Sequence, residues 1–578
     1  MARTGALEEN AGVSVRFNGS PLLMSLLLGL VAFLVLTPLL LMIFNSLQIS
    51  KPGEPVVYGL QGWQEIFTSA GMLVAIYNTF SLAITRQLIA LVLGIFLAWL
   101  LARTDIPMGG WLEFMFWLSF FLPALPVTMG WILLLDPKFG LLNQWLLKLP
   151  FVHEPPFDIY SFWGVIWAHL AATTLGIKVM LLTPAFRNMD AVLEESSRIS
   201  GASPLGTLVR IIAPLMLPAI MVTTILGLVR SLEAFEIELL LGVPIGLHVY
   251  STKIHELVIS EPPDFPPAMA LGTAFLVILL ILVVLQRLVI RRRFYTTVTG
   301  RGFSRRLTPL GRWKYPAFAM VLLLALVITV VPTIFLVMGT FMKLFGFFNI
   351  PEPWTLDNWR GVLKDPVVFR SLWNTILIGL GAGGVGILLY SLIAYIIVKT
   401  RFAGRGLLDF LSWLPWSIPG ILLGIALLWT FLGTKVFLPL YGTIYIMIVA
   451  MVIKSMPFGT QLIKSIMLQL GSELEEASRI SGASWIYTYR RILLPLLFPA
   501  LLTVGLVVFI SAARDISTVV LLATGRSRTL SLLMLDFATE AEFERATVVA
   551  VIIVALVVVS ALIARALGGH LSIRGEAG

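Results

Sequence analysis

The sequence contains no cysteine, and this absence excludes several kinds of chemistry. Without thiols the chain cannot form disulfides, thiolate metal sites or cysteine-ligated iron–sulfur clusters. Histidine is also scarce, and the five residues (His153, His169, His248, His255 and His570) lack the spacing of metal ligands. No loop carries a G-x-x-x-x-G-K-[ST] segment that could hold a nucleotide phosphate. We therefore assign no metal site or bound cofactor and expect no enzyme active site.

Charge is scarce as well, at 12% of residues, while 58% are hydrophobic. Apolar runs such as 21–44, 317–338 and 546–566 are long enough to cross a bilayer as helices, because lipid leaves backbone groups no partner but each other. The first run is longer than the apolar core of a signal peptide, and no A-x-A site follows it. We interpret it as a retained first span of an all-α integral membrane protein.

The second half of the chain repeats the first. Residues 193–220 align without a gap on residues 474–501, and 17 of the 28 pairs are identical. Upstream, YNT at 77–79 matches WNT at 373–375. Three more residues also match, namely Thr104, Trp117 and Pro123 with Thr400, Trp413 and Pro419. The offset between the halves falls by 15 positions in between, so the first half has a longer loop around residues 136–160.

A basic segment joins the halves. Residues 291–314 contain eight lysines or arginines and no acid, so the positive-inside rule places the segment in the cytoplasm. The alternative is a patch for nucleic acid or anionic lipid, but the other basic residues flank apolar runs, as membrane orientation requires; we expect no nucleic-acid partner. We predict a first repeat at 1–295, a cytoplasmic linker at 296–315 and a second repeat at 316–578.

Each half contains six apolar runs, which predicts about 12 transmembrane helices. The fourth run of each half is the weakest, because Lys178, or Lys454 and Pro457, interrupt it. Six spans per half make the two repeats parallel and put both termini and both copies of the repeated segment in the cytoplasm. The runs are near 21–46, 72–102, 111–135, 160–185, 208–230 and 266–290, then 317–342, 372–398, 407–432, 441–465, 492–513 and 546–566.

The repeated segment, LEESSRISGAS at 193–203 and LEEASRISGAS at 474–484, predicts a short helix, a sharp turn and a second helix. Ser472 with Glu475 forms a capping-box pattern, and Asp190 can cap the first copy. Gly201 and Gly482 can end the first helix in a left-handed conformation. Ser203 and Ser484 can cap the second helix, which runs to Pro214 or Pro495. Two such loops on one face imply a partner with two equivalent sites.

The same segment resembles the cytoplasmic signature of permease subunits of binding-protein-dependent ABC importers: E-A-A, three residues, glycine, nine residues, I-x-L-P. The second copy matches with one serine for alanine, at Glu476, Ala477, Ser478, Gly482, Ile492, Leu494 and Pro495. The first copy departs at three positions, with Glu195, Ser196, Ser197, Gly201, Ile211, Ala213 and Pro214. The chain most resembles fused permeases that carry both halves on one polypeptide, particularly the ferric-iron type.

This resemblance implies a bacterial inner-membrane protein and two kinds of protein partner. Residues 190–214 and 472–495, here named the first and second EAA loops, are expected to couple to a dimer of ABC ATPase subunits. Those subunits, and not this chain, are expected to bind ATP and Mg²⁺. A periplasmic binding protein is expected to deliver the cargo. In each loop Glu195 or Glu476 is followed at i, i+3 by Arg198 or Arg479, which favours a rigid helix.

The cargo is the least determined element. Glu233 and Glu236 are expected to share a helix face after the fifth span, and Arg514 and Asp515 occupy the corresponding place in the second half. Carboxylates at membrane depth are candidates for a translocation path, and their hard oxygens suit Fe³⁺. However, Arg230 lies three residues before Glu233 and could simply neutralise it.

Other cargoes and mechanisms remain open. Thiamine, polyamine, sulfate and aminoethylphosphonate importers share the architecture that this resemblance implies. A secondary transporter with two six-span halves would also have parallel repeats, although it would not need twin docking loops. A membrane-embedded enzyme should cluster His, Asp or Glu in several spans, and no such cluster is evident.

Overall fold

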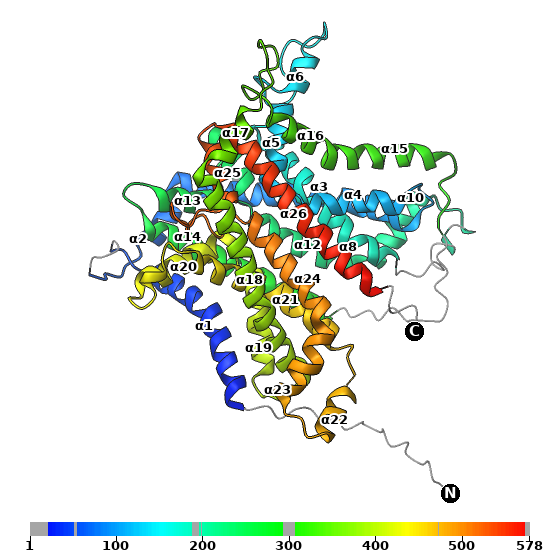
Figure 1. Ribbon diagram of the computed structural model, residues 1–578. Helices are drawn as coiled ribbons and strands as arrows, with labels where there is room; N and C mark the ends of the chain where they lie inside the picture. The colour runs from blue at the N-terminus through cyan, green and yellow to red at the C-terminus, as the bar shows by residue number, and fades with distance from the viewer. Residues whose placement is uncertain are drawn as a thin grey trace.

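The computed structural model describes residues 21–50, 55–187, 196–197, 199–292, 307–471 and 473–572. Within these ranges the chain forms helices and no strands, apart from three isolated bridges. The expected all-α fold is therefore confirmed (Figure 1).

The first repeat begins with one long helix, α1, and five further groups of helices follow it. The helices of the first repeat are α1 (Pro21–Asn45), α2 (Gln61–Thr68), α3 (Ala70–Arg103), α4 (Gly109–Phe121), α5 (Ala124–Leu135), α6 (Leu141–Leu146), α7 (Phe162–His169), η1 (Leu170–Thr174), α8 (Leu175–Arg187), α10 (Pro204–Thr207), η2 (Leu208–Ile212), α11 (Ala213–Leu215), α12 (Leu217–Leu232), η3 (Glu238–Gly242), η4 (Val243–Ile245), α13 (Tyr250–Ile259) and α14 (Phe265–Arg292).

The second repeat follows the same order with a shorter loop after its third span. Its helices are η5 (Gly311–Trp313), α15 (Lys314–Ala325), η6 (Leu326–Val330), α16 (Val331–Gly339), α17 (Asp357–Lys364), α18 (Pro366–Lys399), α19 (Arg405–Trp413), η7 (Leu414–Ser417), α20 (Gly420–Gly433), η8 (Leu438–Leu440), α21 (Ile444–Met467), α22 (Glu473–Ile480), α23 (Trp485–Thr488), η9 (Tyr489–Leu493), α24 (Leu494–Arg514), α25 (Leu530–Thr539) and α26 (Phe543–Ser572).

Within the described residues, nine helices are long and apolar enough to cross a membrane, and three bent helix pairs bring the total to 12 if each pair is one span. These elements correspond to the six expected runs of each half. Both fourth spans are continuous despite their polar residues: α7, η1 and α8 run together, and Pro457 lies inside α21. The fourth span expected in each half is therefore confirmed, although its apolar run is the weakest.

The third span of each repeat is bent rather than straight, which the apolar runs 111–135 and 407–432 did not predict. The bends measure 100° between α4 and α5 and 111° between α19–η7 and α20. Both fall where a residue precedes proline, at Leu122 before Pro123 and at Ile418 before Pro419. The backbone of both preceding residues is extended, because a following proline disfavours helical geometry.

The first span of each repeat packs against the other repeat. Helix α1 lies along α20 and α19, and α16 lies along α5. Figure 1 shows this exchange, with α15 running beside α4 and α1 beside α19. Because each repeat lends one helix to the other, the two halves form a single interlocked unit.

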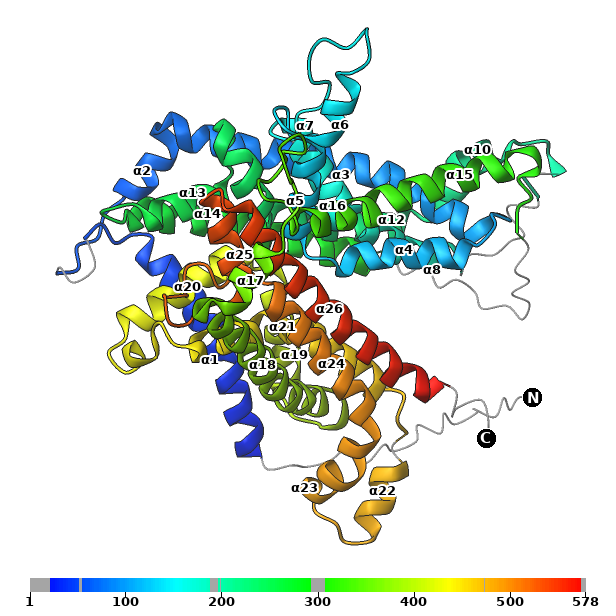
Figure 2. The same cartoon turned by 45° about the horizontal axis from the view of Figure 1, so that its top comes forward.

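The two repeats meet near α5, α16 and α25 and diverge toward the segments that contain the repeated motif. Figures 1 and 2 both place α10 at the end of one arm and α22 with α23 at the end of the other. The loop 136–161, which contains α6, projects from the opposite end of the molecule. The expected longer loop of the first half is therefore present.

Candidate functional site

Both repeated loops turn at a glycine with a left-handed backbone. Gly201 has φ +83° and Gly482 has φ +77°, which confirms the expected geometry. A Cβ added to either glycine would meet nothing within 4 Å. Only the backbone conformation, and not lack of space, therefore requires glycine at these turns.

A hydroxyl pair fastens the two helices of each turn together. Ser197 Oγ lies 2.9 Å from Thr207 Oγ1, and Ser478 Oγ lies 2.8 Å from Thr488 Oγ1. All four residues are buried. The serine that replaces the second alanine of the EAA pattern thus has a structural role, since it fixes the angle between the helices.

Side chains also cap the second helix of each turn. Ser203 Oγ accepts from Gly206 N at 3.1 Å, and Ser484 Oγ accepts from Tyr487 N at 3.4 Å. The caps predicted from sequence are confirmed. The second helix then passes through a π-helical turn, η2 or η9, before Pro214 or Pro495, which are both exposed.

The second EAA loop is tied to the end of the second span. Lys399, the last residue of α18, forms a 3.0 Å ion pair with Glu475 and donates to the Leu470 carbonyl at 2.9 Å. The capping box expected for Glu475 involves Ser472, which lies outside the described residues. This ion pair was not predicted, because its two residues lie 76 positions apart in the sequence.

Each loop presents an apolar side chain at the same position of its turn. Ile199 is 87% exposed and Ile480 is 89% exposed, and Leu205 and Ile486 are exposed on the second helices. The recurrence of the same exposed apolar positions on both loops makes the loops candidate contact surfaces. The arrangement offers two similar contact surfaces, one on each repeat.

The remaining predicted loop residues are only partly described. Ser196 and Ala477 are exposed, and Glu476 is half-buried on α22. Helix α22, with eight residues, is the short helix expected before the turn. Asp190, Glu195 and Arg198 lie outside the described residues, as does the side chain of Arg479 and most of the linker 296–315.

The paired YNT and WNT segments hold a loop helix against the second span. Thr79 Oγ1 accepts from Tyr250 N at 2.9 Å, and Thr375 Oγ1 accepts from Leu530 N at 2.9 Å. The adjacent asparagines donate to loop carbonyls, from Asn78 to His248 and from Asn374 to Arg526 and Arg528. These repeated contacts start α13 and α25 at equivalent places in the two halves.

Glu233 and Glu236 do not share a helix face, so that prediction is wrong. Helix α12 ends at Leu232, and residues 234–235 are not helical. Ser251 Oγ donates to the Ala234 carbonyl at 2.5 Å, and Phe235 is buried, so packing on α13 pulls the chain out of the helix. Glu233 pairs with Arg230 at 2.8 Å, the neutralisation that the sequence had left open.

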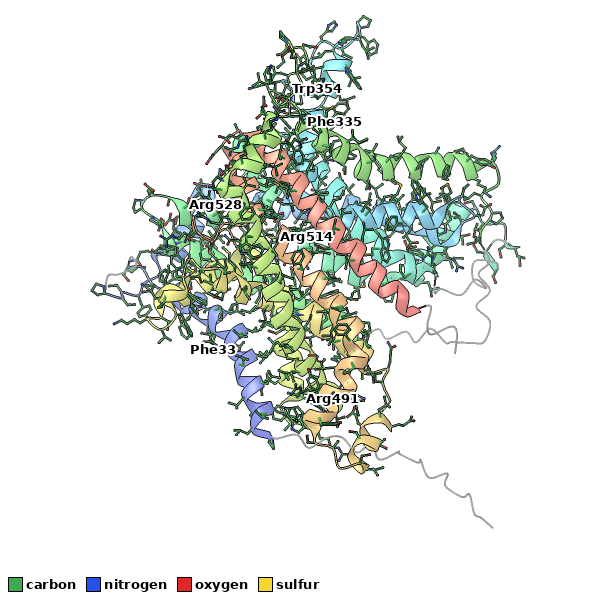
Figure 3. The ribbon with its side chains drawn as sticks, in the orientation of Figure 1. Phe33, Phe335, Trp354, Arg491, Arg514 and Arg528 are labelled. Carbon is green, nitrogen blue, oxygen red and sulfur yellow. The ribbon has the colours of Figure 1, made fainter. Side chains whose placement is uncertain are left out.

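Glu236 and Asp515, by contrast, approach one another from opposite repeats. Glu236 lies within electrostatic range of Asp515, Lys454 and Arg514. Asp515 is buried, forms an ion pair with Lys454 and accepts from Thr518 N at 3.0 Å, so it is largely satisfied within its own repeat. Figure 3 shows Arg514 in the middle of the molecule, between Trp354 near one end and Arg491 toward the second EAA loop.

A buried charged cluster in the first repeat was not predicted. Arg86 Nε donates to Ser231 Oγ at 2.9 Å and Nη1 lies 3.6 Å from Glu238, whose carboxylate is 2.7 Å from His169 Nε2. We name Arg86, His169 and Glu238 the buried triad. It lies where η1 and η3, both π-helical, flank the contact. Arginine inside an apolar run was a visible signal, but its partners were not adjacent in sequence.

Comparison with known proteins identifies the architecture. The family described as binding-protein-dependent transport system inner membrane component matches residues 90–295 and 384–572, once in each repeat. A ferric transport system permease protein of Actinobacillus pleuropneumoniae is 28% identical over 67% of this chain and 55% of its own length. A probable ABC transporter permease protein of Sinorhizobium fredii is 26% identical over 90% of this chain and 92% of its own.

The chain spans little more than half the length of two ferric permease relatives, 55% of the Actinobacillus protein and 58% of one from Haemophilus influenzae. A crystal structure of a bacterial alginate importer overlaps with a TM-score of 0.41 at 22% identity, covering 47% of this chain and 96% of that chain, which is too little to carry an argument. The two family matches cover more than half of this chain and fall one on each repeat. The chain therefore belongs to the family of inner membrane components of binding-protein-dependent transport systems, in a form with two permease repeats.

Proposed function

We propose that this chain supplies both membrane halves of an ATP-driven importer. Its two EAA loops dock on a dimer of separate ATPase subunits, and a periplasmic binding protein delivers cargo to the opposite face. In this arrangement both termini and the linker lie in the cytoplasm. ATP and Mg²⁺ bind the ATPase subunits.

The observation that carries this proposal is the equivalence of the two EAA loops. Each has a left-handed glycine, a serine–threonine pair across the turn and an exposed isoleucine, at positions 281 apart. A partner with two equivalent sites could engage both. The loops end two diverging arms, so drawing them together would tilt the repeats against each other (Figure 2).

The test is Gly482→Val in the reconstituted complex of permease, ATPase and binding protein. A β-branched residue at positive φ costs roughly 1 to 3 kcal/mol of strain, which can mis-aim the second helix without touching the membrane core. We expect transport and binding-protein-stimulated ATPase activity to fall about tenfold or more, with normal insertion.

Gly482→Asn is the matched control, because asparagine tolerates the left-handed region better than valine. It should retain most of the stimulated activity. Gly201→Val should act like Gly482→Val, because both glycines have positive φ and open space around them. Undiminished stimulation in Gly482→Val would contradict coupling through this loop.

For the cargo we propose ferric iron, since several relatives bear ferric transport names. Sulfate and trehalose permeases also match, over about a third of this chain, and thiamine, polyamine and aminoethylphosphonate remain alternatives. Within the described residues, no group of three or more His, Asp or Glu could hold a metal ion.

Proteoliposomes loaded with ATP and the ATPase should accumulate radiolabelled ferric iron when its binding protein is outside. Labelled sulfate or thiamine with their own binding proteins should give background counts. Uptake of sulfate or thiamine, and not of iron, would contradict the proposed cargo and leave the proposal of an importer intact. Uptake that persists without ATP would instead favour a secondary transporter.

A further inference from the structure

Two arginine–aromatic pairs cross the boundary between the repeats. The guanidinium carbon of Arg230 lies 5.4 Å from the ring centroid of Trp416, and that of Arg514 lies 5.5 Å from the ring centroid of Phe120. Arg514 Nη1 also donates to the Phe120 carbonyl at 3.1 Å. We name Phe120, Arg230, Trp416 and Arg514 the central clasp.

The two rings of the clasp follow the repeat, whereas the two arginines lie 284 positions apart and share only their place at the end of a fifth span. Phe120 and Trp416 are 296 positions apart, which is the offset of the matched second and third spans, and each lies just before the bend of its third span. Arg230 is in the last turn of α12, and Arg514 is the last residue of α24. Each arginine therefore reaches from the end of a fifth span to the bend of the opposite third span.

The charges around the clasp allow it to open. Arg230 has a carboxylate partner in its own repeat, Glu233 at 2.8 Å. Arg514 lies within electrostatic range of Glu236 and Asp515. A guanidinium that leaves its aromatic ring is thus not stranded at membrane depth without a counter-charge. A cation–π contact with a second partner at hand suits a contact that forms and breaks.

The position of the clasp suggests what it closes. Arg514 lies in the middle of the molecule in Figure 3, while Figures 1 and 2 show the loop-bearing ends of the repeats apart. We propose that the central clasp closes the passage between the repeats while the EAA loops are apart, and opens when they are drawn together. This inference rests on the proposed function, and it adds the residues that gate the passage.

Removal of both rings tests the gate. Phe120→Ala/Trp416→Ala should raise ATPase activity without binding protein at least about threefold and lower the cargo carried per ATP. The matched control is Trp111→Ala/Leu407→Ala, which removes two exposed apolar side chains nine positions earlier at equivalent sites of the third spans. The control should keep wild-type coupling. Equal uncoupling in both variants, or normal coupling in the first, would overturn the proposal.

A second measurement does not depend on the stability of that variant. The chain has no native cysteine, so Arg230→Cys/Trp416→Cys offers one cross-linkable pair and leaves the other half of the clasp intact. A bifunctional maleimide should join this pair in the nucleotide-free complex. The yield should fall at least about threefold after trapping with ATP and vanadate, and the joined complex should lose uptake.

If the yield of cross-linked protein does not change on trapping, or if the cross-linked complex takes up cargo normally, the proposal that the clasp is a gate is wrong. Failure of the proposed function has a different signature, because the wild-type complex would then show no ATP-dependent uptake of any cargo. If uptake proves ATP-independent, loss of that uptake in the joined chain still supports closure at the clasp.

Discussion

The two repeats share their helix order but fill the space between their second, fourth and fifth spans differently. In the first repeat Lys178, fully buried, donates to the Thr223 carbonyl at 2.7 Å, and the buried triad lies nearby in the same helix group. In the second repeat the residues that match Arg86 and Lys178 are Ala382 and Gly459. At these two positions the same fold thus has charged side chains in one repeat and small residues in the other.

One contact between the second and fourth spans follows a size rule: one of the two facing residues is small and the other is large. In the first repeat Gly94 of the second span faces Lys178 of the fourth, and an added Cβ would lie 2.4 Å from the lysine. In the second repeat the large residue is on the other helix: Tyr390 matches Gly94, and an added Cβ on Gly459 would lie 2.2 Å from its ring. Close helix packing in lipid needs one small partner, but either helix can supply it.

By contrast, the parts that would move or couple are the same in both repeats. The turn glycine, the serine–threonine pair, the threonine that starts α13 or α25, and the two rings of the clasp recur at matching positions. The repeats therefore share the residues that shape their turns and helix starts, and they differ in the side chains that pack between their spans. The following experiments can break or sharpen that contrast.

The largest expected effect concerns whether the repeats cross the membrane in the same direction. Gly300→Cys and Ile480→Cys should be shielded from an impermeant thiol reagent applied to the periplasmic face, whereas Pro150→Cys should react almost completely. The cysteine-free background makes the labelling specific. Labelling of position 480 from outside would show that the EAA loops cannot meet one cytoplasmic partner.

The buried triad should give the largest stability effect. Arg86→Met leaves Glu238 buried without its arginine, which typically costs about 3 to 5 kcal/mol. The triple variant Arg86→Met/His169→Met/Glu238→Met removes every charge and should cost much less, because methionine fills irregular space. Thermal unfolding in detergent checks both. Equal losses would mean that the triad does more than balance its own charges.

The size rule at Gly94 predicts a rescue. Gly94→Tyr alone should collide with Lys178 and cost about 1 to 3 kcal/mol as overpacking. Gly94→Tyr/Lys178→Gly reproduces the arrangement of the second repeat and should recover most of that loss. The yield of monodisperse protein and its melting temperature are the measurements. A double variant no better than the single one would mean that the two contacts are not interchangeable.

The smallest effect is expected at the serine of the second EAA loop. Ser478→Ala removes one hydrogen bond, a net loss of about 1 kcal/mol, and Thr488 keeps a 3.2 Å bond to the Ser484 carbonyl. Stimulated ATPase activity should stay within about twofold of wild type. Ser481→Ala, at an exposed position of the same turn, is the control and should have no effect.

Much of this architecture could be predicted because its causes are local in the sequence. Hydrophobic run length gives the spans, glycine and serine at fixed spacing give the turn of each EAA loop, and the 281-position repeat gives two equivalent loops. Each feature depends on residues within a few positions of one another, or on comparison of the two halves. These are the features that the structure confirms.

Contacts between distant residues could not be predicted in the same way. The pairing of Glu475 with Lys399 and the clasp across 394 positions of chain depend on how helices cross. The two glutamates after the fifth span looked like one helix face, but packing of Ala234 and Phe235 ended the helix between them. Periodicity alone does not contain that information.

The fifth spans show which features the sequence determines and which the tertiary structure decides. Both carry two prolines four positions apart, Pro214 with Pro218 and Pro495 with Pro499, so the sequence by itself allows a bend in each. The first repeat is bent by 76° at this point, while α24 continues through Pro499. The sequence determined where the helices can bend, because proline lacks the backbone N–H that donates a hydrogen bond within a helix. Only the tertiary structure decided which helix bends, because neighbouring helices set the final path.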